Sequence, residues 1–403
     1  MKNVVIIGAG HGAGQLVMSL RQKKFQGHIT LVGEEDWHPY QRPPLSKKFL
    51  SGELSAERLF LKPPAFYDDP SLSPVLNSRV MVIDRDARQI ATNDGKSYDY
   101  DALVIATGSR PRQLDVPGTD LDGIHYLRGI DDVNAIRASM SNSEHVSIIG
   151  AGYIGLEVAA VARQLDKKVT VVEMENRVMS RVVSPELSAY YESVHSEHGV
   201  QILPSTSMTA FPGETRSDGV ILDNGETLTT DMVVIGVGIV PNTELAEAAG
   251  LITDNGIVVD DHCRTSDASI YAIGDCTWHP NSQLGKSLRL ESVHNAVEQA
   301  KTAAANLCGK DTVYSQVPWF WSDQYDLKLQ IAGVSQGYDE VVLRGDMTTH
   351  SFSCLYLRDG KLIAVDAVNA PRDYVQGRLL IAGNVRIDPA RLADPNIPLK
   401  DLV

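Results

Sequence analysis

Two glycine-rich segments of the chain have the spacing that lets a backbone turn hold phosphate groups. In the pattern G-x-G-x-x-G/A, the first glycine makes a tight turn, the second lets the backbone approach a pyrophosphate, and the last position packs a helix on a strand. The residues that fill it are Gly8, Gly10 and Ala13 in the first segment and Gly150, Gly152 and Gly155 in the second. A helix that begins at such a turn points its positive end at the phosphates. We therefore expect two bound dinucleotides.

An acidic residue follows each glycine pattern about 20 residues later, where a carboxylate can accept hydrogen bonds from a ribose. These residues are Glu34 and Glu173. The charge of Glu173 would repel a 2′-phosphate, which favours NADH over NADPH. Arg177 and Arg181 lie just downstream and could accommodate that phosphate. NADH is therefore the predicted donor, and how strictly it is preferred stays open.

Hydrophobic patterning predicts the elements that position these residues. Residues 3–34 and 145–173 each contain an apolar run, a glycine turn, a helical pattern and a second apolar run that leads to a glutamate. Each is one βαβ unit, and about 140 residues separate their starts, so each is expected to nucleate its own sheet. After Val317, short β-rich runs predict an antiparallel sheet. The predicted fold class is α/β, with two Rossmann-like nucleotide-binding domains plus a smaller α+β C-terminal domain.

The composition argues against several other classes of protein. A chain of 403 residues has room for two or three domains. Its formal net charge of −14 argues against non-specific binding to nucleic acid, which depends on lysine and arginine. No apolar run approaches the roughly 18 residues of a membrane span, so we expect no membrane segment and a cytoplasmic protein. The four cysteines and eleven histidines show no metal-ligand spacing.

A series of longer motifs makes a resemblance to one family specific. In chain order these motifs are GAGHGAG, PYQRPPLSK, ATGSRPR, GAGYIGLE, GVGIVPNT, YAIGDC, ESVHNAVEQA, PWFWSDQ and RLADPNIPLK. From about residue 3 to its end, the chain resembles the ferredoxin reductases that serve aromatic-ring dioxygenases and bacterial cytochrome monooxygenases, a branch of the glutathione-reductase superfamily. The resemblance implies an enzyme that takes hydride from NADH onto FAD and passes single electrons to a 2Fe-2S ferredoxin.

The resemblance also implies how the chain is divided and which residues hold the cofactors. Residues 1–110 and 242–316 would form a discontinuous FAD-binding domain, residues 111–241 the NADH-binding domain, and residues 317–403 the C-terminal domain. In the family, the aspartate that matches Asp275 holds the ribityl hydroxyls of the flavin. The residues expected to bind the two cofactors are Gly8, Gly10, Ala13, Glu34, Arg42, Lys47, Ala106, Thr107, Gly108, Gly150, Gly152, Ile154, Gly155, Glu173, Gly238, Gly274, Asp275, Val293 and Trp321.

Three residues are implied to act at the flavin ring. Lys47 matches the family's lysine beside the ring, where a cation stabilises the anionic reduced form, and Glu157 matches the carboxylate that keeps this cation in place. Taken alone, the first would be a solvated surface lysine and the second a helix-face carboxylate. Trp321 is implied to lie beside the isoalloxazine on the route by which electrons leave, whereas an aromatic residue taken alone is as often part of a core.

Alternatives remain within and outside this group. Disulfide reductases of the superfamily need a cysteine pair near the flavin, and no cysteine precedes Cys263, so thiol chemistry is not expected. A rubredoxin reductase shares almost every motif. A relative of the apoptosis-inducing factors, in which NADH controls assembly, is a third possibility. An acidic ferredoxin would need a local basic patch on this acidic chain, for which the candidate residues are Arg289, Arg344, Arg372 and Arg378.

Overall fold

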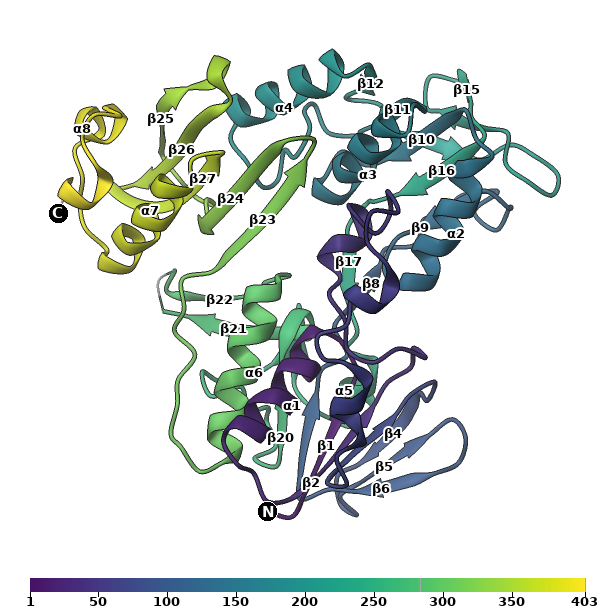
Figure 1. Ribbon diagram of the computed structural model, residues 1–403, viewed down its shortest axis with the longest axis vertical. Helices are drawn as coiled ribbons and strands as arrows, with labels where there is room; N and C mark the ends of the chain where they lie inside the picture. The colour runs from purple at the N-terminus through teal and green to yellow at the C-terminus, as the bar shows by residue number, and fades with distance from the viewer. Residues whose placement is uncertain (283, 403) are drawn as a thin grey trace. The chain divides into compact units, whose positions relative to one another are not determined.

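The structure, a computed structural model, describes residues 1–282 and 284–402 (Figure 1). Its backbone contacts divide the chain into two compact units. Unit 1 comprises Met1–Arg42, Glu57–Arg110 and Val240–Pro318, and unit 2 comprises Pro43–Ala56, Pro111–Ile239 and Trp319–Val403. Within the described residues, no helix has the length and apolar character that crossing a membrane requires.

Unit 1 is built on a five-stranded parallel sheet with the strand order β20-β7-β1-β2-β3. The strands of this sheet are β1 (Asn3–Ile7), β2 (His28–Val32), β3 (Leu72–Val75), β7 (Ala102–Ile105) and β20 (Ile270–Ala272). Helices α1 (His11–Gln22) and α6 (Val293–Leu307) share a core with Val4 and Ile6 on one face. Val5 and Ile7 are buried on the other face. The central strand β1 is therefore apolar from Val4 to Ile7, where both of its faces are covered.

Smaller elements complete unit 1. An antiparallel sheet, β4-β5-β6, contributes to the core on the second face of the parallel sheet, and a four-stranded sheet has the order β18-β19-β21-β22. The remaining bounds are β4 (Val80–Asp84), β5 (Gln89–Thr92), β6 (Ser97–Asp99), α5 (Glu244–Ala248), β18 (Thr253–Asp254), β19 (Gly256–Val258), β21 (Thr277–Asn281) and β22 (Lys286–Leu288). Strands β8 (Ser109–Pro111) and β17 (Ile239–Pro241) lie where the chain passes between the units.

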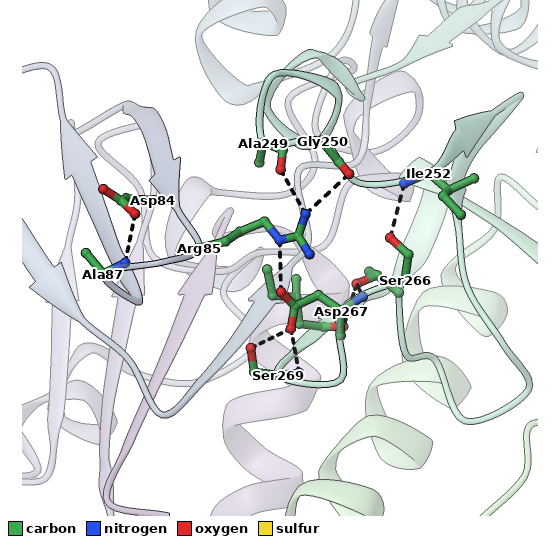
Figure 2. Close-up of polar contacts among 11 residues, drawn as sticks. Asp84, Arg85, Ala87, Ala249, Gly250, Ile252, Ser266, Asp267 and Ser269 are labelled. Atoms are coloured by element: carbon green, nitrogen blue, oxygen red, sulfur yellow. Dashed lines mark hydrogen bonds and ion pairs between the residues drawn. The ribbon is translucent and has the colours of Figure 1, made fainter.

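Arg85 ties together parts of unit 1 that are far apart in the sequence (Figure 2). Its Nε donates to Asp267 Oδ2 at 2.9 Å, and its Nη1 donates to the carbonyl oxygens of Ala249 and Gly250, each at 3.3 Å. Asp267 also accepts hydrogen bonds from the backbone and the hydroxyl of Ser269, next to β20. Residues 57–110 and 240–318 of unit 1, which precede and follow residues 111–239 of unit 2 in the sequence, are thereby held together.

Unit 2 contains a second five-stranded parallel sheet, with the order β12-β11-β10-β16-β9. A three-stranded sheet, β13-β14-β15, shares the core on one of its faces. The bounds are β9 (Ile124–Tyr126), α2 (Ile130–Ser141), β10 (His145–Ile149), α3 (Tyr153–Gln164), β11 (Lys168–Val172), α4 (Pro185–Glu197), β12 (Val200–Leu203), β13 (Met208–Ala210), β14 (Gly219–Leu222), β15 (Thr227–Thr229) and β16 (Met232–Ile235).

The last part of unit 2 is an antiparallel sheet with the order β23-β24-β27-β26-β25, against which α7 packs. The bounds are β23 (Trp319–Gln324), β24 (Leu327–Gly333), β25 (Glu340–Asp346), β26 (Ser351–Arg358), β27 (Lys361–Val368), α7 (Pro371–Gly383) and α8 (Pro389–Ala393). The structure thus has two parallel sheets, in each of which a central strand, β1 or β10, leads into a glycine turn and a helix, and one smaller α+β part. The predicted fold class is confirmed.

One buried acid in this last sheet makes stability depend on pH. Asp366 on β27 is 1% exposed and accepts a hydrogen bond from the hydroxyl of Tyr356, which itself accepts one from the backbone N–H of Ser184. Burial raises the pKa of Asp366 to about 7, because a carboxylate without water is disfavoured. A folded-state pKa above the unfolded value means that stability is lost as the pH rises from about 4 to about 7.

We expect Asp366→Asn to remove this loss, because an amide does not ionise. The melting temperature of the variant should exceed that of the wild type by about 3 °C or more at about pH 8, and this difference should shrink at about pH 5. Asp359→Asn, in the exposed turn between β26 and β27, is the control and should show the same pH dependence as the wild type. Melting curves that shift in parallel for both variants would contradict the account.

Candidate active site

The first glycine turn has the geometry of a phosphate cradle. Strand β1 ends at Ile7, and α1 begins directly after Gly10. Gly8 has φ +103°, and a Cβ there would lie 2.2 Å from the carbonyl oxygen of Ala106. A Cβ on Gly10 would meet no atom of residues 1–282 and 284–402 within 4 Å, so open space lies at the N-terminus of α1. Ala13, in the first turn of α1, is fully buried. The turn fits the pyrophosphate of a dinucleotide.

Two buried polar atoms also suit a bound group, one directly after this turn and one in the first turn of α6. His11 Nδ1 and Asn295 Oδ1 have no hydrogen-bond partner within the part of the chain that the structure describes. Burial lowers the pKa of His11 to about 4, so its imidazole is neutral near pH 7 and brings no positive charge to a phosphate. His11 is therefore a neutral neighbour of the cradle.

The carboxyl ends of neighbouring strands bring further predicted residues to the same edge of the unit 1 sheet. Ala106, Thr107 and Gly108 directly follow β7. Thr107 Oγ1 donates to the carbonyl oxygen of Asn242 at 2.8 Å, and Asn242 Nδ2 donates back to the carbonyl oxygen of Thr107 at 2.9 Å. These two bonds hold the turn after β7 rigidly beside Gly8.

The turn after β20 is held in the same way. The backbone N–H of Gly274 donates to Gln299 Oε1 at 2.7 Å, and the hydroxyl of Ser109 donates to Asp275 Oδ2 at 3.0 Å. Val293 is the first residue of α6, at the N-terminus of that helix. The predicted FAD ligands that follow β1, β7 and β20 and that begin α6 thus lie at one end of unit 1.

Arg42 and Glu34 are also at this end of unit 1, with different surroundings. Arg42 donates to the hydroxyl of Tyr40 at 2.9 Å and to the carboxylate of Glu35, and Tyr40 donates to the same carboxylate. Glu35 was not among the residues predicted from the sequence to bind a cofactor. Only its position next to Glu34 pointed to it. Glu34 is exposed, stands two residues beyond the end of β2, and has its Oε1 3.6 Å from Arg79 Nη1.

The second glycine turn, in unit 2, repeats the first. Gly150 has φ +100°, with a Cβ position 2.5 Å from the carbonyl oxygen of Gly236, and a Cβ on Gly155 would lie 2.1 Å from the carbonyl oxygen of Gly150. Gly152 precedes α3, and a Cβ there would meet none of the described atoms within 4 Å. Ile154, in the first turn of α3, is 44% exposed. This turn too fits a pyrophosphate.

The surroundings of Glu173 bear on the choice of nicotinamide cofactor. Its Oε2 accepts a hydrogen bond from the backbone N–H of Ala151 at 2.6 Å, so a negative charge lies beside the second cradle. Arg177 is occupied elsewhere, because its guanidinium donates to the carbonyl oxygens of Ser180 and Val183 and to a nearby serine hydroxyl. Arg181 is exposed, and its Nη2 lies 3.8 Å from the Cβ position of Gly238, another predicted ligand.

Lys47 and Glu157, which are far apart in the sequence, form a buried ion pair within unit 2. Lys47 follows the short 3-10 helix η1 (Pro43–Ser46), and its Nζ lies 2.7 Å from Glu157 Oε2. Their side chains are 15% and 2% exposed. Hydroxyls of Ser46 and Ser322 also donate to this carboxylate, the second at 2.6 Å. Lys47 is therefore not a solvated surface lysine, and Glu157 is not an exposed carboxylate on a helix face.

Trp321 lies on β23 with two other aromatic residues. Its ring centroid is 5.6 Å from that of Trp319, at an interplanar angle of 33°, and it is half-buried. Phe320, on the opposite face of the strand, makes an edge contact with Tyr153 at 5.2 Å. Trp321 is thus not part of a closed core, and its place beside a flavin remains a prediction.

Comparisons with known proteins agree with this arrangement. The family model described as pyridine nucleotide-disulphide oxidoreductase matches residues 2–300, and the one described as reductase C-terminal matches residues 319–403. Rhodocoxin reductase from Rhodococcus erythropolis is 44% identical over 99% of this chain and 93% of its own length. Rubredoxin-NAD(+) reductase from Pseudomonas putida is 38% identical over 92% of this chain and 96% of its own length.

Solved structures match over the whole chain. The ferredoxin reductase for the CYP199A2 system from Rhodopseudomonas palustris has a TM-score of 0.96 and 44% identity, covering 99% of both chains. The reductase in the covalent putidaredoxin reductase–putidaredoxin complex has a TM-score of 0.96 and 40% identity, covering 100% of this chain and 98% of the other. The chain therefore belongs to the pyridine nucleotide-disulphide oxidoreductase family, among the ferredoxin reductases of oxygenase systems that its motifs indicate.

Proposed function

We propose that this chain is an NADH:ferredoxin oxidoreductase that delivers electrons singly to a 2Fe-2S ferredoxin serving an oxygenase. The observation that carries the proposal is the full-length likeness to a reductase that was crystallised in covalent complex with putidaredoxin. The expected cofactors, FAD and NADH, are confirmed by the family to which the chain belongs. We further propose that the enzyme works in the cytoplasm.

FAD supplies the chemistry when bound, since it accepts a hydride from NADH and releases electrons one at a time. The protein binds FAD, aligns it and places charged side chains around it. We propose that the turn at Gly8–Gly10 binds the pyrophosphate of FAD, that Asp275 holds its ribityl hydroxyls, and that the turn at Gly150–Gly152 binds NADH. Lys47 then places a positive charge where negative charge develops, and Glu157 holds Lys47 there.

The remaining predicted ligands have supporting roles in this proposal. In unit 1, Glu34 would bind near the adenosine of FAD, and Arg42 would bind near its flavin. In unit 2, Trp321 would line the route by which electrons leave. The residues proposed as backbone or packing contacts to the two cofactors are Ala13, Ala106, Thr107, Gly108, Ile154, Gly155, Gly238, Gly274 and Val293.

We expect Glu173 to select NADH over NADPH. Glu173→Ser removes the negative charge beside the second cradle, so the ratio of kcat/KM for NADH to that for NADPH should fall about tenfold. Glu175→Ser makes the same change of charge at an exposed residue nearby and is the control. Equal ratios in the two variants would show that Glu173 does not select the cofactor.

The proposed function is tested by two half-reactions under anaerobic conditions. One equivalent of NADH should bleach the absorbance of the bound flavin, and two equivalents of oxidised ferredoxin should restore it. Restoration by rubredoxin instead would favour the rubredoxin reductases, a class to which one 38% identical relative belongs. A flavin that stays reduced with both carriers would contradict the proposal and favour a binding protein controlled by NADH.

The structure narrows the basic residues available to an acidic ferredoxin. Arg344 is 4% exposed and donates to the backbone carbonyls of the segment around α8, so its role is structural. Arg289 is 14% exposed in its side chain and forms an ion pair with Glu291. Arg372 and Arg378 both lie on α7, where Arg372 is exposed. Burial therefore removes Arg344 from the four arginines that the sequence offered as candidates for a basic docking patch.

A further inference from the structure

A chain of hydrogen bonds runs from Glu157 into the interior of unit 2, away from its lysine partner. Ser322 Oγ donates to Glu157 Oε1 at 2.6 Å, and Gln324 Nε2 donates to Ser322 Oγ at 3.2 Å. His195 Nε2 lies 2.8 Å from Gln324 Oε1, and the hydroxyl of Tyr325 lies 3.2 Å from His195 Nδ1. Four consecutive bonds therefore connect the carboxylate of the candidate site with a half-buried tyrosine.

Four of the five members of this chain come from three elements of unit 2, and Tyr325 directly follows β23. Glu157 lies on α3, His195 lies on α4, and Ser322 and Gln324 are two residues apart on β23 and so share one face of that strand. Helix α3 packs against β23. The exposed fractions of the four are 2%, 0%, 0% and 1% respectively. Buried polar side chains cost stability unless they are hydrogen-bonded, so their mutual bonds are what makes this arrangement tolerable.

The carboxylate sets the direction of every bond in the chain. A carboxylate only accepts, so Ser322 must donate its single proton to Glu157 and can only accept from Gln324. The amide nitrogen of Gln324 must then face Ser322, which turns its oxygen toward His195. An amide oxygen only accepts, so His195 carries its proton on Nε2 and accepts at Nδ1 from Tyr325. One charge thus determines the tautomer of an imidazole three bonds away.

The protonation of the outer members agrees with this direction. Burial lowers the pKa of His195 to about 4, so the ring is neutral near pH 7 and has one N–H to donate. Burial raises the pKa of the Tyr325 phenol, so Tyr325 keeps its proton. Its ring stacks on His198, with centroids 3.8 Å apart. The end of the chain is therefore anchored against α4.

We propose that Ser322, Gln324 and His195 are positioning residues that hold the Glu157 carboxylate in one orientation and through it fix the ammonium of Lys47 for hydride transfer. The inference rests on the proposed role of Lys47 at the flavin. Glu157 Oε2 receives Lys47 and Ser46, and Oε1 receives Ser322. Without the donor to Oε1, the carboxylate is held at Oε2 alone, so we expect Oε1 to lose its fixed place and the ammonium of Lys47 to shift with the carboxylate.

The kinetic test compares two buried serines of the same sheet. Ser322→Ala should lower the rate at which NADH bleaches the bound FAD about fivefold, with little change in KM for NADH. Ser353 on β26 is also 0% exposed and donates to a carboxylate, that of Asp373, so Ser353→Ala is the matched control and should keep the wild-type rate. Equal rates in the two variants would overturn the proposal.

A double-mutant cycle tests whether Ser322 acts through Glu157. In a Glu157→Gln background, Ser322→Ala should have almost no further effect on the bleaching rate, because the orientation that the hydroxyl maintains is already lost. Gln324→Leu breaks the chain one bond further out and should resemble Ser322→Ala. Effects that simply multiply would show that Ser322 acts independently of Glu157 and would refute the inference.

A spectroscopic test needs no turnover. In ¹⁵N-histidine-labelled protein, the His195 signal, assigned by its loss in His195→Gln, should show the Nε2–H tautomer, and Gln324→Leu should weaken that preference. An Nδ1–H or charged ring in the wild type would disprove the chain even if all rates were as expected. If NADH fails to bleach the wild-type flavin, the proposed function fails, whereas the tautomer still decides whether the chain exists.

Discussion

Replacing Lys47 with alanine is expected to slow the bleaching of bound FAD by NADH about a hundredfold while leaving the FAD content unchanged. The loss follows from the charge, because the reduced ring is anionic and a fixed cation beside it stabilises that charge in a site with little water. Glu157 keeps two further donors, Ser46 and Ser322, so its carboxylate is not left without partners. Stopped-flow absorbance measures the rate directly.

Two further variants make this first test specific. Lys48→Ala removes a neighbouring exposed lysine and should leave the rate unchanged. Lys47→Arg retains the charge and should recover most of the rate, although its different shape prevents full recovery. If Lys47→Ala and Lys48→Ala reduce at the same rate, Lys47 is a structural lysine and the proposed site is wrong.

The second large effect is expected at the two open glycine positions, which should lose different cofactors. Gly152→Val should raise KM for NADH more than about a hundredfold, because its side chain would fill the space that a pyrophosphate needs. The flavin spectrum should be retained, and dithionite should still bleach it. Gly10→Val should instead yield protein without FAD.

The structure explains why these two substitutions should spare the fold. At both positions a Cβ would meet none of the described atoms within 4 Å, and each residue precedes a helix in an extended backbone conformation. Melting temperatures of the apoproteins should therefore stay close to that of wild-type apoprotein. Loss of both cofactors from either variant, without unfolding, would contradict the assignment of one cradle to each nucleotide.

Much of the scaffold was predictable because its signals are local. The apolar run before Gly8, the glycine turn itself and the helix after it lie within about 20 residues, and their periodicities differ between strand and helix. The antiparallel sheet after Val317 was visible for the same reason. Arg177 could not be interpreted from local sequence alone. Its position after β11 suggested a phosphate ligand, but its guanidinium binds backbone carbonyls of the loop before α4.

The polar interior of unit 2 was not predictable from one sequence. Ser322 and Gln324 are separated from His195 by more than a hundred residues, and nothing in their spacing shows that β23 packs beside α3 and α4. Arg344 likewise appeared as one surface arginine among several, although it holds the carbonyls near α8. Lys47 and Glu157 were paired through a family resemblance, since neither residue carries a local signal for the other.

The most direct test of the proposed function is the steady-state reduction of cytochrome c by NADH and the purified flavoprotein. We expect rapid reduction when a 2Fe-2S ferredoxin is present and little reduction when it is omitted or replaced by rubredoxin. Slow reduction with either carrier, together with a long-lived complex between the protein and NADH, would contradict the assignment as a ferredoxin reductase.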